Sequence, residues 1–121
     1  MKPLDASQIT KFLERFDDFK ESEIRSLEII SPTEMKITLT AQDRARAFDW
    51  VTVTMLFNGV SDAKLIDESK LGFVDMDNGI TILKEGDSFA FGLGHYKNIS
   101  ALKDAQLYLI SQTIKYNEGA F

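Results

Sequence analysis

The spacing of the apolar residues changes once along this chain, and this change constrains the fold more than any other feature of the sequence. Near the start, four apolar residues are spaced as i, i+3, i+4 and i+7, which places them on one face of a helix. They are Ile9, Phe12, Leu13 and Phe16. From Glu23 onward the apolar residues alternate with polar ones, as in a strand with one buried face. The sequence therefore predicts one amphipathic helix followed by strands.

The predicted helix has a clear start signal. Asp5 is a favourable N-cap, and Gln8 three positions later can return a hydrogen bond to it, as in a capping box. Leu4 and Ile9 flank this cap at the spacing of a hydrophobic staple. These signals predict a helix over residues 6–16, and its apolar face must pack against another part of the protein.

The first half of the strand region predicts a hairpin and a third strand. Met35, Ile37 and Leu39 alternate with polar residues, and the shorter apolar segment Leu27–Ile30 precedes them. Turn-forming residues separate the two segments at positions 31–34, so they are expected to pair. The segment Trp50–Phe57 is rich in β-branched and aromatic residues, and an Asn-Gly turn signal follows it.

The second half predicts more short antiparallel strands. Phe73–Met76 and Ile80–Leu83 flank an Asp-Asn-Gly turn and are interpreted as a hairpin. Ser88–Leu93 is the next strand, whereas Lys64–Ile66 fits either a short strand or a loop. Residues 99–116 have both helical spacing and strand composition, and a strand is favoured.

These elements predict an α+β fold in one domain, residues 1–121. The N-terminal amphipathic helix is expected to pack on a mostly antiparallel, curved β-sheet of about six to eight strands. Short connections favour this order, because consecutive antiparallel strands can pair directly.

Composition excludes several classes of function. The chain has no cysteine, so disulfides, thiolate metal sites and a cysteine nucleophile are excluded. The net charge is −5, and its 14 basic residues are scattered among 19 acidic ones, which argues against nucleic-acid binding. The acidic balance suits a basic protein partner. The N-terminus lacks the apolar run of a signal peptide, and no stretch is long enough to span a membrane, so a cytoplasmic location without membrane contact is expected.

No motif for catalysis, metal binding or cofactor binding is complete. Asp75–Gly79 begins like a calcium loop, but Gly and Glu are missing from the positions that such a loop needs. A tight turn explains this segment better. Gly92–Lys97 has two glycines of a dinucleotide fingerprint and lacks the third. The clustered carboxylates of Asp17, Asp18, Glu21 and Glu23 are interpreted as a solvated connection. No catalytic residue, metal or cofactor is therefore predicted.

The segment Phe89–Tyr96 is the predicted binding surface. Phe89 and Phe91 share one face of a strand, and His95 and Tyr96 follow on a glycine-rich bend. Exposed aromatic side chains often anchor protein contacts. The alternative is that both phenylalanines face the core. His95 is the only histidine and is expected to lie at the surface without a catalytic role.

One short segment resembles a known group of proteins. Phe16-Asp17-Asp18-Phe19, leading through Ser22-Glu23-Ile24 into the first strand, resembles the opening of small bacterial β-rich proteins, several uncharacterised and some classed as immunity proteins of toxin systems. Asp17 stands where those proteins often carry histidine. The resemblance implies a binding role without catalysis.

Three functions follow as hypotheses. The preferred one is a non-catalytic protein-binding module, such as an immunity or accessory protein. The alternative is a small-ligand-binding protein or enzyme with a pocket between the helix and the sheet. The third is a structural subunit of a larger assembly.

Overall fold

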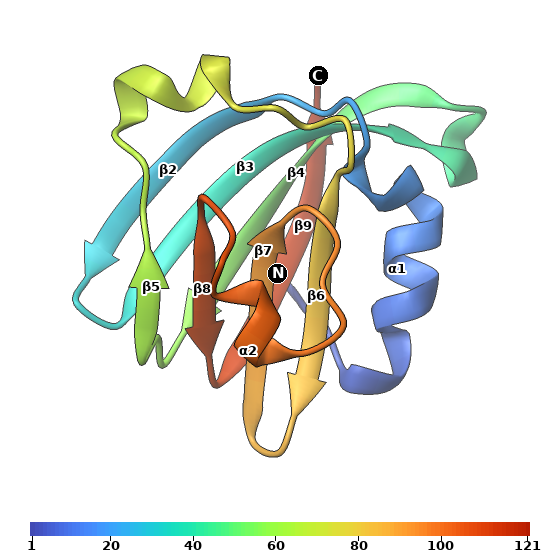
Figure 1. Ribbon diagram of the computed structural model, residues 1–121. Coiled ribbons are helices and arrows are strands. Elements are labelled where there is room, and N and C mark those ends of the chain that lie inside the picture. Colours follow the sequence, from blue (N-terminus) through green and yellow to red (C-terminus); the bar gives the residue numbers. More distant parts are fainter.

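Nine strands form two antiparallel sheets in the computed structural model, which describes residues 1–121 (Figure 1). The first sheet has the order β1-β9-β4-β3-β2 and the second has the order β5-β8-β7-β6. The strands are β1 (Lys2–Pro3), β2 (Ile24–Ser31), β3 (Glu34–Asp43), β4 (Asp49–Asn58), β5 (Asp62–Lys64), β6 (Ile80–Glu85), β7 (Ser88–Leu93), β8 (Tyr108–Ser111) and β9 (Thr113–Ala120). The helices are α1 (Ile9–Arg15) and α2 (Ile99–Leu102), with 3-10 turns η1 (Ala6–Gln8), η2 (Asp17–Phe19), η3 (Arg44–Arg46) and η4 (Glu68–Phe73).

The N-terminal helix starts where the sequence predicts. The side-chain oxygen of Gln8 accepts a hydrogen bond from the Asp5 main-chain nitrogen at 3.2 Å. The 3-10 turn η1 leads directly into α1, so the helical segment covers residues 6–15. The rings of Phe12 and Phe16 are buried and meet edge to face, with their centroids 5.3 Å apart. The predicted apolar stripe therefore does face the protein interior.

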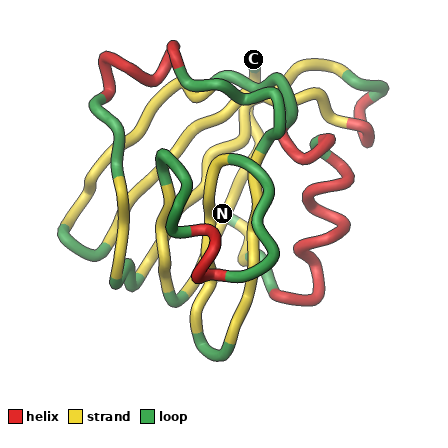
Figure 2. Tube along the Cα trace, viewed as in Figure 1, coloured by secondary structure: helices red, strands yellow, loops and turns green.

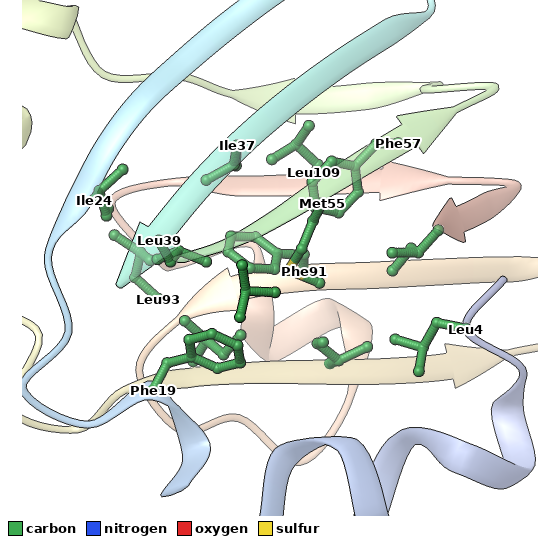
Figure 3. Close-up of a cluster of buried hydrophobic side chains, with 14 of the residues drawn as sticks. Leu4, Phe19, Ile24, Ile37, Leu39, Met55, Phe57, Phe91, Leu93 and Leu109 are labelled. Carbon is green, nitrogen blue, oxygen red and sulfur yellow. The ribbon is translucent and has the colours of Figure 1, made fainter. Parts of the chain in front are cut away.

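The two sheets pack face to face around one hydrophobic core. Strand β3 pairs with β4 along its whole length, from Glu34 opposite Asn58 to Asp43 opposite Asp49. Alternate residues of both strands are buried, as the period of two predicts. Figure 3 shows core side chains from both sheets, among them Phe57 and Phe91, whose ring centroids lie 5.3 Å apart. The predicted α+β class and antiparallel pairing are confirmed.

The sequence predicts one curved sheet of six to eight strands, whereas the structure has nine strands in two sheets. The chain passes from one sheet to the other at two neighbouring points, Gly59 and Gln112. The main-chain nitrogen of Gln112 donates to the carbonyl oxygens of Asn58 and Gly59 at 3.0 and 3.2 Å. Each crossing takes only a few residues, so the strands before and after it look continuous in the sequence.

The helix α1 covers one open side of this two-sheet arrangement. Figures 1 and 2 show it beside β6 and β9, outside the strands. The ring of Phe12 meets that of Tyr116 on β9 at 4.7 Å between centroids. The turn η4 lies at the opposite side, next to β2 (Figure 1). The helix and the turn thus close the two sides that the sheets leave open.

The predicted hairpin around residues 73–83 is wrong in its first half. Residues 68–73 form the turn η4, and residues 74–76 belong to no strand. The carbonyl oxygen of Met76 accepts from the Glu21 nitrogen at 2.8 Å and from the Gly79 nitrogen at 3.0 Å. The segment therefore pairs with the connection after α1 and not with β6. The tight turn at residues 76–79 is present as predicted.

The C-terminal segment contains both predicted conformations. Residues 99–102 form the short helix α2, and the side chain of Asn98 caps it by accepting from the Ala101 nitrogen at 2.8 Å. Residues 108–111 and 113–120 are strands, as favoured from their composition. None of the helices has the length and apolar character that a membrane crossing requires.

Candidate protein-binding surface

Three side chains at the end of the five-stranded sheet stack on one another while remaining exposed. The rings of Trp50 and Phe121 lie 5.7 Å apart between centroids, and 42% and 59% of the two residues are exposed. The guanidinium group of Arg25 lies 4.3 Å from the centroid of the Phe121 ring. Its Nη1 also donates to the main-chain oxygen of Phe121 at 2.7 Å. We call Arg25, Trp50 and Phe121, together with the exposed Phe48 in the adjoining loop, the aromatic patch.

The strand register explains why these rings face outward. Val51 and Val53 on β4 are buried, so Trp50 has the opposite parity and lies on the outer face of the sheet. Val51 pairs with Ala120 on β9, which places Phe121 beside Trp50. The outward direction of Trp50 follows from the alternation of residues in Trp50–Phe57, which the sequence shows. The position of Phe121 depends on how β9 pairs with β4, which no local pattern shows.

The loop between β3 and β4 presents Phe48. The turn η3 begins where the Asp43 side chain accepts from the Ala45 nitrogen at 2.9 Å. Ala47 and Phe48 then adopt left-handed backbone conformations, with φ values of 55° and 64°. This conformation is unfavourable for a bulky residue, and the Phe48 side chain is nevertheless exposed. The fold therefore holds an apolar ring in water on a strained loop.

The connection between α1 and β2 is rich in acidic residues and lies at the same end of the molecule (Figure 1). Asp17, Asp18 and Glu21 have left-handed φ values of 53°, 54° and 58°. They are held in place because Phe16 and Phe19 are buried on either side. Hydrogen bonds connect this segment to β3, where the Glu23 nitrogen donates to Thr40 Oγ1 at 2.8 Å. We call the carboxylates of this segment and of the neighbouring residues 75–77 the acidic rim: Asp17, Asp18, Glu21, Glu23, Asp75 and Asp77. One of them, Asp17, is paired with Arg44 at 3.6 Å.

A buried ion-pair network joins α1 to the sheet beneath this end. Asp43 is fully buried, and Arg15 on α1 donates to it through two nitrogens at 2.9 and 2.8 Å. Arg15 also contacts Glu118 on β9 at 2.7 Å, and Lys2 contacts the same carboxylate at 3.3 Å. The hydrogen bonds from Arg15 lower the pKa of Asp43. Burial opposes ionisation of Glu118, but its hydrogen bonds and the charge of Arg15 prevail and lower its pKa as well.

Replacing Asp43 with Asn is expected to lower the free energy of unfolding by about 2 kcal/mol at neutral pH. Breaking a buried pair usually costs about 3–5 kcal/mol, but Arg15 is 30% exposed and water can partly solvate it. Because the pKa of Asp43 is lowered on folding, its contribution is present above the unfolded pKa and is lost as the pH falls through the folded pKa. Denaturant titrations at decreasing pH should show the gap between wild type and Asp43→Asn closing below about pH 4. A gap that stays constant to pH 2 would contradict this assignment.

The structure places the four sequence-predicted site residues differently. Phe89 and Phe91 are buried in the core, where they offer no surface to a partner, because their strand face is the inner one. His95 is exposed. Tyr96 is half buried and packs against a small cluster on the outer face of the four-stranded sheet. His95 and Tyr96 therefore lie on the opposite face of the molecule from the aromatic patch, and the four residues form no single surface.

The space between α1 and the sheets holds no open pocket at its centre. It is filled by Phe12, Phe16 and Phe19, whose ring centroids lie 5.3–5.8 Å apart. Two hollows remain beside the helix. One of about 200 Å³ lies against Phe12 and Tyr116, and one of about 480 Å³ is lined by Lys2, Arg15, Arg46, Glu118, Gly119 and Ala120. No group of three or more His, Asp or Glu side chains is placed to hold a metal ion.

Gly92 is needed for packing, because a Cβ atom there would lie 2.7 Å from the side chain of Leu102.

Comparison with family models, curated proteins and solved structures finds no match for this chain. Its function must therefore be argued from its own residues.

Proposed function

We propose that this protein is a non-catalytic protein-binding module, of the immunity or accessory type, that binds a basic protein through the aromatic patch and the acidic rim. The observation that carries the proposal is the exposed stack of Arg25, Phe121 and Trp50. Tryptophan and arginine are the residue types most enriched among side chains that dominate protein interfaces. A binding role is also what the resemblance to immunity proteins implies.

The stack supports binding because it is already ordered. An interface side chain that must be immobilised costs about 0.5–1.5 kcal/mol in lost freedom. Here the Arg25 guanidinium is fixed by the ring and main-chain oxygen of Phe121, and the Trp50 ring rests against the same phenylalanine. The patch therefore presents a preformed apolar surface, and a partner that covers it gains the burial of aromatic area.

The acidic rim is the reason for proposing that the partner is basic. The carboxylates of Asp17, Asp18, Glu21 and Glu23 border the end of β3, the strand that pairs directly with β4 and so with the strand of Trp50. Complementary charge at the edge of an interface mainly accelerates association and fixes orientation. The rim would guide a basic surface toward the aromatic patch, and this effect weakens as salt screens the charges.

The proposal predicts that Trp50→Ala abolishes partner capture. Wild-type protein immobilised on resin would be incubated with a lysate of the source organism, and bound proteins would be identified by mass spectrometry. Truncating an interface-dominating residue typically costs at least about 2 kcal/mol, so recovery should fall roughly thirtyfold. Raising the salt concentration should reduce recovery by the wild type.

Tyr96→Ala is the matched control for this capture. Tyr96 is an aromatic residue on the opposite face, in the segment Phe89–Tyr96 that the sequence predicts as the binding surface. Recovery of the partner by this variant should equal recovery by the wild type. Denaturant titration should first show that both variants are folded, because Trp50 is outside the core but Tyr96 packs against the small cluster on the four-stranded sheet. Loss of the partner with Tyr96→Ala but not with Trp50→Ala would overturn the proposal and support the surface predicted from sequence.

A further inference from the structure

A separate hollow is lined by residues of β5, of η4 and of the segment before β8. Figure 1 shows β5 and η4 at the side of the molecule away from α1. Its volume is about 360 Å³, which is within the lower range of small-ligand sites. Its lining combines three apolar and three polar side chains: Ile66, Phe73, Val74, Lys64, Lys70 and Gln106.

The apolar wall of this hollow is unusually open to water. Phe73 ends η4 and is 89% exposed, the largest exposure among the large apolar residues. Its neighbour Leu71 is buried and ties η4 to the core, so the turn that carries Phe73 is anchored. Ile66 and Val74 are half buried and pack against the same core. A fixed apolar wall next to water gains free energy from any ligand that covers it.

The polar side of the hollow carries two cations without counterions. Neither Lys64 nor Lys70 takes part in an ion pair, in contrast to Lys2, Lys36 and Lys103. Three carboxylates lie near the lysines in the sequence. Asp62 pairs with Lys103 at 3.2 Å, and Asp67 accepts from the nitrogen and the hydroxyl of Ser69 at 2.9 and 2.7 Å. Glu68, on η4, forms no ion pair with either lysine. The lysines therefore remain available to an anion.

We infer that this hollow binds a small amphipathic carboxylate, such as a free medium-chain carboxylic acid. The alkyl chain would cover Ile66, Phe73 and Val74, and the carboxylate would accept hydrogen bonds from Lys64 and Lys70, with the Gln106 amide as a further donor. Two lysines and one exposed phenylalanine are too few for stable attachment to a membrane surface, where each basic residue contributes only about 1 kcal/mol. This inference does not depend on the aromatic patch.

Titration with octanoate below its micellar concentration tests the inference, with backbone amide NMR shifts as the readout. Saturable shifts should centre on residues 64–74 and Gln106. Octylamine, which has the same alkyl chain and the opposite charge, should not produce them. The variants Lys64→Gln/Lys70→Gln and Phe73→Ala should each weaken octanoate binding by about tenfold, because each removes one of the two recognition terms.

Lys115→Gln is the control for a general loss of charge, because Lys115 lies on β9 in the other sheet and makes no ion pair. It should bind octanoate as the wild type does. Equal shifts with octylamine, equal weakening by Lys115→Gln, or shifts spread over the surface would overturn the inference. Trp50→Ala should leave octanoate binding unchanged, so failure here and failure of the proposed protein-binding function can be told apart.

Discussion

Replacing Phe16 with Ala is expected to lower the free energy of unfolding by about 3–5 kcal/mol. Phe16 is 1% exposed, and its ring lies 5.3 and 5.4 Å from those of Phe12 and Phe19. These three rings fill the space between α1 and the sheets, so the truncation leaves a cavity that the backbone can only partly close. Urea titration should show a lower midpoint with an unchanged slope.

Lys11→Ala on the same helix is the control for this change. Lys11 is exposed, and its substitution should alter the free energy of unfolding by less than about 0.5 kcal/mol. A loss below about 1 kcal/mol for Phe16→Ala would mean that the helix contributes little to the core. Such a result would contradict the packing of α1 described above.

Gly79→Ala is expected to cost about 3 kcal/mol or more, from two causes that add. Gly79 has a φ of 68°, a conformation that penalises any residue with a Cβ atom. A Cβ atom there would also lie 2.0 Å from the carbonyl oxygen of Asp18. This oxygen belongs to the main chain of the segment that carries the acidic rim. It can move only if residues 17–21, most of which have left-handed φ values, move with it.

Gly86→Ala separates the two causes. Gly86 has a φ of 58°, but nothing lies within 4 Å of the position of its Cβ atom. Gly86→Ala should therefore lower the free energy of unfolding only by the conformational penalty of about 1 kcal/mol. Denaturant titration gives the loss in free energy of unfolding for each variant. The difference between the two losses is the contribution of the close approach of Gly79 to Asp18. Equal losses for the two variants would show that this contact does not constrain the acidic rim.

The helix and most strands could be predicted because their signals are local. The capping residues Asp5 and Gln8 and the apolar spacing that ends at Phe16 lie within one short segment, and the alternation along β3 repeats over ten residues. The failed hairpin shows the limit of such signals. Phe73 and Val74 have the composition of a strand, but the Met76 carbonyl pairs with Glu21, more than fifty residues away in the chain. No local pattern contains that pairing.

The candidate site was harder to predict for the same reason. Trp50 and Phe121 become neighbours only through the register of β4 and β9, and Arg25 reaches them from a third strand. Phe89 and Phe91 share one strand face, as the sequence indicates, but only the packing of two sheets decides that this face is the inner one. The sequence therefore left two possibilities open for Phe89 and Phe91, an exposed anchor or a core face, and the structure places both rings in the core.

Site-specific photocrosslinking in the source cell tests the central claim most directly. A photoreactive phenylalanine analogue would replace Trp50 in one variant and Asp87, at the distant tip of the β6–β7 hairpin, in the other (Figure 1). We expect irradiation to link position 50 to one basic protein and position 87 to none. Crosslinking of that same protein at position 87 but not at position 50 would show that the aromatic patch is not the binding surface.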